Sequence, residues 1–300
     1  MYTGILSLIH MLTLNQQDTE RYCRKMRYER FEKYGARIRF LYIHNLTHGI
    51  FLVLLKGQRR IKKQKLVVVH DRRRRTNAPI IICPTHIGGA DIEMTFEAIK
   101  TPCWLAWGDP RELYKHIDGM MLQINGVIPF DTCHKKDRVI AKANMEALLR
   151  KGGNLLIFPE GAYNITQELL LNHLYAGAVE LAITCHAEII PVALVRDQNT
   201  YYINIGENID YSSYSKADSY ALTDALRDCI ATLEWEILEK LPLTKREELS
   251  EEYQEQFIAE CFEMGDSYTY TVQDIQETVF KPKDQTSPKE AFAYLDKLSH

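Results

Sequence analysis

Residues 79–96 read PIIICPTHIGGADIEMTF and join an apolar run, a glycine pair and an amphipathic run. The apolar residues 80–83 predict a short buried strand. Pro84 and the pair Gly88-Gly89 predict the turn that ends it. Apolar side chains at helical spacing then predict a helix that reaches Ile99. A strand–turn–helix junction is typical of α/β proteins, which commonly keep their chemistry at such turns.

His86 precedes Asp91 by five residues within this stretch. On one continuous helix the two side chains would point apart by roughly 140°. They can meet only if His86 lies in the turn and Asp91 in the first turn of the helix. The carboxylate would then orient the imidazole as a general base for a hydroxyl, an amine or a thiol. A plain helix N-terminus, with Asp91 favoured by the helix dipole and His86 at the surface, fits the same residues.

The rest of the chain repeats the alternation of apolar strands and helices. We expect strands at 65–70, 79–84, 103–107, 126–131, 153–158 and 188–195, and helices near 90–100, 110–124, 136–151 and 172–186. Continuous apolar strands between helices predict an α/β fold with a mostly parallel twisted sheet flanked by helices. The alternating residues 201–209 predict an edge strand, and apolar residues on one face from 219 to 241 predict a long helix.

Three regions follow from this pattern. Residues 1–62 are expected to be an N-terminal helical, membrane-interface segment, with one helix over 19–57. Residues 63–210 are expected to form the α/β core, and residues 211–300 a helical C-terminal extension packed on it. Charged and polar residues interrupt the apolar part of 36–57, so its uninterrupted run is shorter than the roughly 20 residues of a spanning helix.

Charge is unevenly distributed although the net charge is only −3. Apolar residues 40–55 precede a basic run over 56–75, and acidic residues dominate after 241. We expect residues 40–75 to bind an anionic membrane surface, which would make the chain a peripheral (monotopic) protein. A helix packed on the core beside a solvated basic loop is the alternative. The arginines at 72–75 lack interleaved aromatic residues, so no nucleic-acid partner is expected. Seven scattered cysteines indicate reduced thiols and thus the cytoplasmic face.

A second informative stretch is NLLIFPEGAYN, residues 154–164. Glu160 follows a buried strand and would lie on the same side of a parallel sheet as His86. Gly161 would allow a substrate close to the backbone. A metal site formed by His86, Asp91 and Glu160 is an alternative, but neither a helical histidine pair nor cysteine ligands support it, so no metal or cofactor is expected.

Four blocks together resemble the glycerolipid acyltransferases of the 1-acylglycerol-3-phosphate acyltransferase type. HIGGAD (86–91) is similar to the H-x4-D motif of that family, and FPEGAYN (158–164) resembles its F-P-E-G block. GVIPFDT (126–132) lies where the family has a glycine-led strand, and IIPVAL (189–194) matches a later block. Four blocks in order are far more specific than any one of them.

The resemblance implies an acyltransferase that moves a fatty acyl group from acyl-CoA or an acyl-carrier protein to a hydroxyl of a lysophospholipid or glycerolipid-like acceptor. His86 would be the base and Asp91 would orient it. No covalent enzyme intermediate is needed, because the thiolate is already a good leaving group. Glu160 and Gly161, together with Asn164 in the same block, would help to hold the acceptor. The thioester is a co-substrate, so no cofactor is implied.

The sequence departs from the family at the acceptor residues. Thr132 stands where an arginine would pair with the acceptor phosphate, and a hydroxyl does not replace a bidentate guanidinium. Lys135, Lys136 and Arg138 are the alternative cations. Lysophosphatidate is therefore a doubtful acceptor. A lysophospholipid with a larger headgroup, an amine or amino-acid acceptor, and a non-catalytic lipid-surface protein on the same scaffold remain the alternatives.

Overall fold

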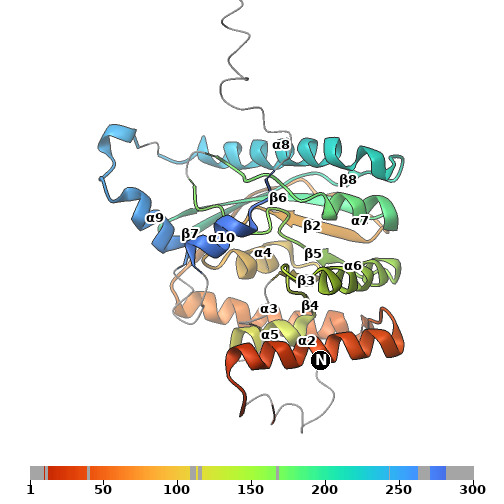
Figure 1. The fold of residues 1–300 in the computed structure, drawn as a ribbon. Helices are drawn as coiled ribbons and strands as arrows, with labels where there is room; N and C mark the ends of the chain where they lie inside the picture. The colour runs from red at the N-terminus through yellow and green to blue at the C-terminus, as the bar shows by residue number, and fades with distance from the viewer. Residues whose placement is uncertain are drawn as a thin grey trace, which may run out of the picture.

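The computed structural model describes residues 10, 13–38, 41–108, 113, 117–166, 169–242, 244–262 and 271–281. Its centre is an eight-stranded sheet with the order β1-β7-β6-β2-β5-β3-β4, and β8 pairs with β6 (Figure 1). The strands are β1 (Lys65–Asp71), β2 (Ile80–Pro84), β3 (Trp104–Trp107), β4 (Val127–Pro129), β5 (Leu155–Leu156), β6 (Glu188–Asp197), β7 (Thr200–Ile205) and β8 (Ile209–Asp210).

Five neighbouring strands, β6, β2, β5, β3 and β4, are parallel, whereas β7, β1 and β8 run in the opposite direction. The prediction of a mostly parallel sheet is thus confirmed. We call the side of the sheet at which the five parallel strands end the carboxyl side, and the side at which they begin the amino side.

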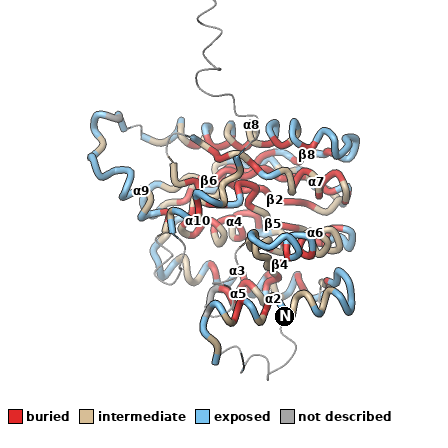
Figure 2. Tube along the Cα trace, viewed as in Figure 1, coloured by how far each residue is buried: buried red, intermediate tan, exposed pale blue. Residues whose placement is uncertain are grey.

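The sheet is buried on both faces (Figure 2). Successive residues of β2 contribute to two different cores, because side chains alternate across a strand. Ile80 and Ile82 join the core formed with α3 (His44–Ile61), α4 (Asp91–Ile99) and α5 (Ile117–Asn125). Ile81 and Cys83 join the core formed with α6 (Lys135–Arg150), α7 (Gly177–Cys185) and α8 (Ser219–Leu238).

The remaining helices lie outside these two layers. They are α2 (Gln16–Tyr34), which packs on α6, and α9 (Tyr253–Cys261) and α10 (Val272–Thr278). Short 3-10 helices cover Leu41–Ile43, Lys216–Asp218 and Arg246–Glu248. None of the helices in the described part of the chain combines the length and the apolar composition that a membrane crossing requires.

Two local predictions are wrong. The single helix expected over 19–57 is divided into α2 and α3, because Gly35 ends α2 with a positive φ of 64°. The edge strand expected at 201–209 is β7, an interior strand between β1 and β6. Its alternation reflects two covered faces: Tyr201 is fully buried toward α4, while Asn204 donates hydrogen bonds to α8 at Leu233 and Glu236.

The structure also divides the basic run of residues 56–75. The seven residues of β1 separate the lysines before it from the arginines after it by roughly 20 Å. Lys65, the first residue of β1, lies at the carboxyl side of the sheet. Arg74 and Arg75 lie beside Ile80, the first residue of β2, and thus at the amino side. The basic residues therefore do not form one continuous surface.

Candidate active site

The turn after β2 brings His86 and Asp91 together at the carboxyl side of the sheet. Gly88 and Gly89 adopt positive φ angles of 76° and 59°, which make the turn before α4. His86 Nδ1 lies 2.8 Å from Asp91 Oδ2, and the backbone N–H of Gly88 donates to the same oxygen at 2.9 Å. A carboxylate only accepts, so Nδ1 carries the proton and Nε2 is left as the basic nitrogen.

The pair is held rigidly. Asp91 is 1% exposed, so the imidazole faces a carboxylate shielded from water. The preceding residue, Thr85, accepts a hydrogen bond from the Leu194 N–H at 2.8 Å and so ties the turn to β6. The ring of His86 packs against Phe158 and Tyr163, with ring centroids 4.1 and 4.4 Å apart. A buried anion and two aromatic walls leave the imidazole little freedom to turn.

Glu160 lies beneath His86 and is fully buried. Its two oxygens accept the backbone N–H groups of His86 at 2.8 Å and Asn172 at 2.9 Å. Burial raises the pKa of Glu160 to about 7 despite these two hydrogen bonds, which lower it. We expected Glu160 to hold the acceptor. The structure places this side chain under the turn, with no exposed surface, where it holds the backbone of His86 and Asn172.

The other predicted residues of this block are also committed to the protein. The Asn164 N–H donates to the His86 carbonyl at 2.8 Å, and its side-chain amide donates to the carbonyls of Leu169 and Leu170. Gly161 has a φ of +75°, and a Cβ there would lie 2.6 Å from the ring of Tyr175. The glycine is therefore required by the fold at this turn.

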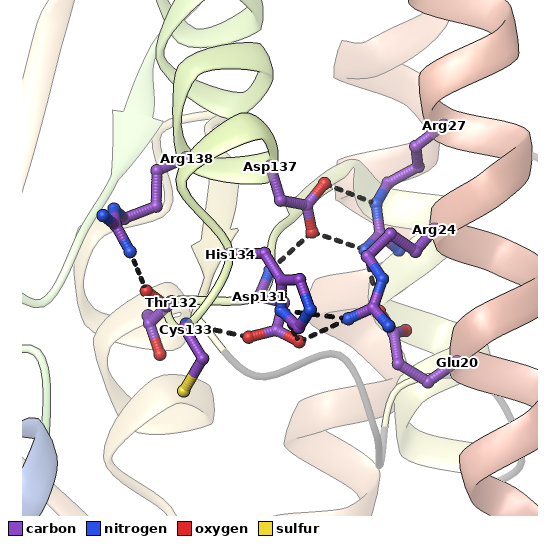
Figure 3. A network of polar contacts seen from close by, with 9 residues as sticks. All are labelled: Glu20, Arg24, Arg27, Asp131, Thr132, Cys133, His134, Asp137 and Arg138. Atoms are coloured by element: carbon purple, nitrogen blue, oxygen red, sulfur yellow. Dashed lines mark hydrogen bonds and ion pairs between the residues drawn. The ribbon is translucent and has the colours of Figure 1, made fainter.

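The predicted acceptor block around Thr132 follows β4 (Figure 3). Thr132 is half-buried, and its carbonyl accepts a hydrogen bond from the guanidinium of Arg138. Lys136 instead pairs with Glu32 of α2 at 2.6 Å, and Lys135 is exposed at the start of α6. Of the three alternative cations, Arg138 is the one that the structure places at Thr132.

A buried ion-pair network attaches this block to α2 (Figure 3). Arg27 donates to both oxygens of Asp137 at 3.2 and 2.6 Å, and to Glu20 at 2.8 Å. Asp137 also accepts the N–H of Asp131 at 2.7 Å, and Asp131 accepts from Arg24 at 2.8 Å. Sequence reasoning missed this network, because the contacts that join α2 to the block span 107 and 110 positions and no local pattern marks them.

The end of α9 covers the turn between His86 and Asp91. The Gly89 N–H donates to the Cys261 carbonyl at 3.1 Å, and a Cβ on Gly88 would lie 2.3 Å from the same oxygen. Phe262 packs edge-on against Tyr163, with ring centroids 6.1 Å apart. The C-terminal extension thus forms part of the site, which the sequence did not indicate.

An apolar pocket lies beside the pair, between α3, α4 and α5. Phe51 and Leu55 of α3 line one wall, Met121 and Leu122 of α5 line another, and Asp91 lines the end next to the imidazole. The pocket measures only about 30 Å³, which is room for about one water molecule and too little for a fatty acyl chain unless its side chains move apart. Within the described residues no three His, Cys, Asp or Glu side chains are grouped as metal ligands.

Comparison with known proteins adds two findings. A family model described as Acyltransferase matches residues 65–195, which contain all four sequence blocks. The crystal structure of the 1-acyl-sn-glycerophosphate (LPA) acyltransferase PlsC from Thermotoga maritima is similar in fold, with a TM-score of 0.52 and 12% identity. That similarity covers 80% of this chain and 89% of that chain. No curated protein sequence matches significantly.

Proposed function

We propose that the chain is an acyltransferase of the glycerolipid type, because the Acyltransferase family model matches residues 65–195 and the fold is similar to that of a solved 1-acyl-sn-glycerophosphate acyltransferase. It transfers a fatty acyl group from acyl-CoA or an acyl-carrier protein to a hydroxyl of a lysophospholipid or glycerolipid-like acceptor. The observation that carries this proposal is the 2.8 Å contact between His86 Nδ1 and the buried carboxylate of Asp91.

The mechanism follows from that contact. His86 Nε2 takes the proton of the acceptor hydroxyl while the oxygen of that hydroxyl attacks the thioester carbonyl carbon. Asp91 stabilises the imidazolium that forms. The tetrahedral intermediate then collapses, the carbon–sulfur bond breaks, and the imidazolium returns the proton to the departing thiolate. The new oxygen ester and the free thiol are the products.

The surroundings of the pair are compatible with these substrates. The apolar side chains of the small pocket between α3 and α5 lie beside Asp91, and they would have to move apart to admit the acyl chain. Arg138, next to Thr132, is the cation available to an anionic acceptor. A guanidinium bound to a carbonyl is less available than a free one, which favours an acceptor with a larger headgroup over lysophosphatidate.

We also propose that the enzyme works at the cytoplasmic face of a membrane as a peripheral protein. One face of α3 packs on the core, and the other presents Leu46, Ile50, Val53 and Leu54, which are 68%, 54%, 71% and 50% exposed. These positions recur at helical spacing and form one apolar stripe. Such a stripe suits the interface of a bilayer, and Lys56 and Lys62 at the end of α3 would face anionic headgroups.

The test is a thiol-release assay with purified protein, acyl-CoA or acyl-carrier-protein thioesters, and a panel of acceptors. The panel contains lysophosphatidate, lysophospholipids with larger headgroups, a monoacylglycerol and amino acids, and mass spectrometry identifies the product. We expect ester formation that His86→Ala abolishes while thermal stability changes little. Amide products alone would replace the proposal by N-acyl transfer. Equal ester formation by His86→Ala would refute the mechanism.

A further inference from the structure

The arginine run after β1 lies far from the site just described. Segment 72–79 returns from the end of β1 to the start of β2, and Arg74 and Arg75 face the amino side of the sheet. His86 lies beyond the opposite end of β2. Neither the proposed reaction nor the membrane-facing stripe of α3 uses these arginines.

A hollow of about 770 Å³ opens beside the segment. Ile80 of β2 and the residues just before β3 and β5, Thr101 and Asn154, lie on one side of it. Arg74, Arg75 and neighbouring residues of the segment lie on the other. Small-molecule sites in proteins typically measure about 300–1,000 Å³. The hollow is therefore large enough for a phosphorylated metabolite as well as for a single inorganic ion.

The backbone around the two arginines is fixed by the fold. The Arg74 N–H donates to the side chain of Asn208 at 3.0 Å, and Asn208 in turn donates to Glu188. Thr76 donates to the other oxygen of Glu188 at 2.8 Å and accepts the Ala78 N–H at 3.0 Å. These contacts hold the segment in one conformation, so a ligand would not have to order it.

The carboxylates of Asp71 and Glu188 at the hollow accept hydrogen bonds from neighbouring residues and offset part of the arginine charge. Arg73 is neutralised by Asp71, to which it donates two hydrogen bonds of 2.8 and 2.6 Å. Asp210 lies near Arg74. Hydrogen bonds from Ser212 are the largest cause that lowers the pKa of Asp210, and the positive charge of Arg74 lowers it further. Among the described residues, no hydrogen bond or ion pair engages the guanidinium of Arg74 or Arg75. Like charges in one concave site raise the local potential and favour an anion.

We propose that this hollow is a second ligand site, in which Arg74 and Arg75 bind the phosphate groups of a soluble small molecule. Guanidinium groups match phosphate oxygens with paired hydrogen bonds, and two of them suit a ligand with at least two negative charges. Asn77 and Thr101 supply polar groups for the rest of the ligand. The phosphate of an anionic lipid headgroup shares this chemistry, so the test separates the two sources.

The experiment measures binding of inorganic pyrophosphate to the full chain by isothermal titration calorimetry. The variant is R74Q/R75Q, and the matched control is R21Q/K25Q, which removes the same charge from the exposed face of α2. We expect the dissociation constant to rise at least about tenfold in R74Q/R75Q and less than about twofold in R21Q/K25Q, since one charge-assisted hydrogen bond accounts for such a factor. Acyl transfer without pyrophosphate should not change in either variant.

A second arm uses co-sedimentation with phosphatidylglycerol vesicles. The proposal requires R74Q/R75Q and R21Q/K25Q to sediment alike. No pyrophosphate binding by the wild type at millimolar concentration, or an equal loss in both variants, would overturn the site. Loss of vesicle binding in R74Q/R75Q alone, with weak pyrophosphate binding unchanged, would overturn the soluble ligand in favour of a lipid headgroup.

Discussion

Replacing Asp91 by asparagine separates two contributions that a buried carboxylate makes to a histidine base. One oxygen, Asp91 Oδ2, accepts both from His86 Nδ1 at 2.8 Å and from the Gly88 N–H at 2.9 Å. The backbone donor cannot rotate, so it should hold the amide oxygen of the introduced asparagine in the same place. The Nδ1–H tautomer of His86 would then survive, and only the negative charge would be lost.

The size of the loss follows from that geometry. A hydrogen bond to a charged group contributes about 1.5–3 kcal/mol and a neutral one about 0.5–1.5 kcal/mol. The variant should therefore lose about 1–2 kcal/mol of transition-state stabilisation, which is about 5- to 30-fold in kcat/KM. Inversion of the tautomer would instead cost about 10⁴-fold, as in the serine-protease triad. Asp91→Ala removes both the charge and the orientation, so it should approach that larger loss.

The assay is steady-state thiol release with the best acceptor of the panel, and thermal denaturation reports folding. Asp91→Ala should also be less stable by about 1–3 kcal/mol, because it leaves the buried Gly88 N–H without an acceptor. A loss near 10⁴-fold for Asp91→Asn would show that the backbone donor does not control the tautomer. A loss below about threefold would show that Asp91 does not stabilise the imidazolium.

Three further predictions address the surroundings of the pair. Gly88→Ala should lower the free energy of unfolding by at least about 2 kcal/mol more than Gly152→Ala, because both glycines have a φ of +76° but only at Gly88 would a Cβ lie 2.3 Å from the end of α9. Equal losses of stability in thermal denaturation would contradict that packing. Burial raises the pKa of Glu160 from 4.5 to about 7, so the free energy of unfolding should fall by about 3 kcal/mol as pH rises from 4.5 to 7 and the carboxyl ionises in the folded chain. Urea unfolding at both pH values should show that Glu160→Gln removes this loss, and a pH profile of the variant identical to that of the wild type would count against the prediction. Leu46→Ser with Val53→Ser should weaken co-sedimentation with anionic vesicles at least about tenfold at unchanged thermal stability, and unaltered sedimentation would remove α3 from the interface.

Local patterns were enough to predict much of the core and the contact between His86 and Asp91. The apolar run of β2 predicted a strand covered on both faces, and all five of its residues are buried. The glycine pair and the five-residue spacing predicted a turn that brings His86 to Asp91, and the contact is 2.8 Å. These features depend on neighbours within a few residues, where turn chemistry and side-chain periodicity act directly.

Tertiary structure alone decided what lies around that pair. The direction of β1, set by its pairing with β7, carried Arg74 and Arg75 to the side of the sheet opposite to the lysines that precede β1. Packing also buried Glu160 under His86, joined Arg27 to Asp137 across 110 positions, and brought α9 over Gly89. From the sequence alone, a charged side chain can equally be exposed to solvent, form a buried ion pair or bind a ligand. Its partner is chosen only when distant segments meet, because burial of a charge is tolerated only where that partner is present.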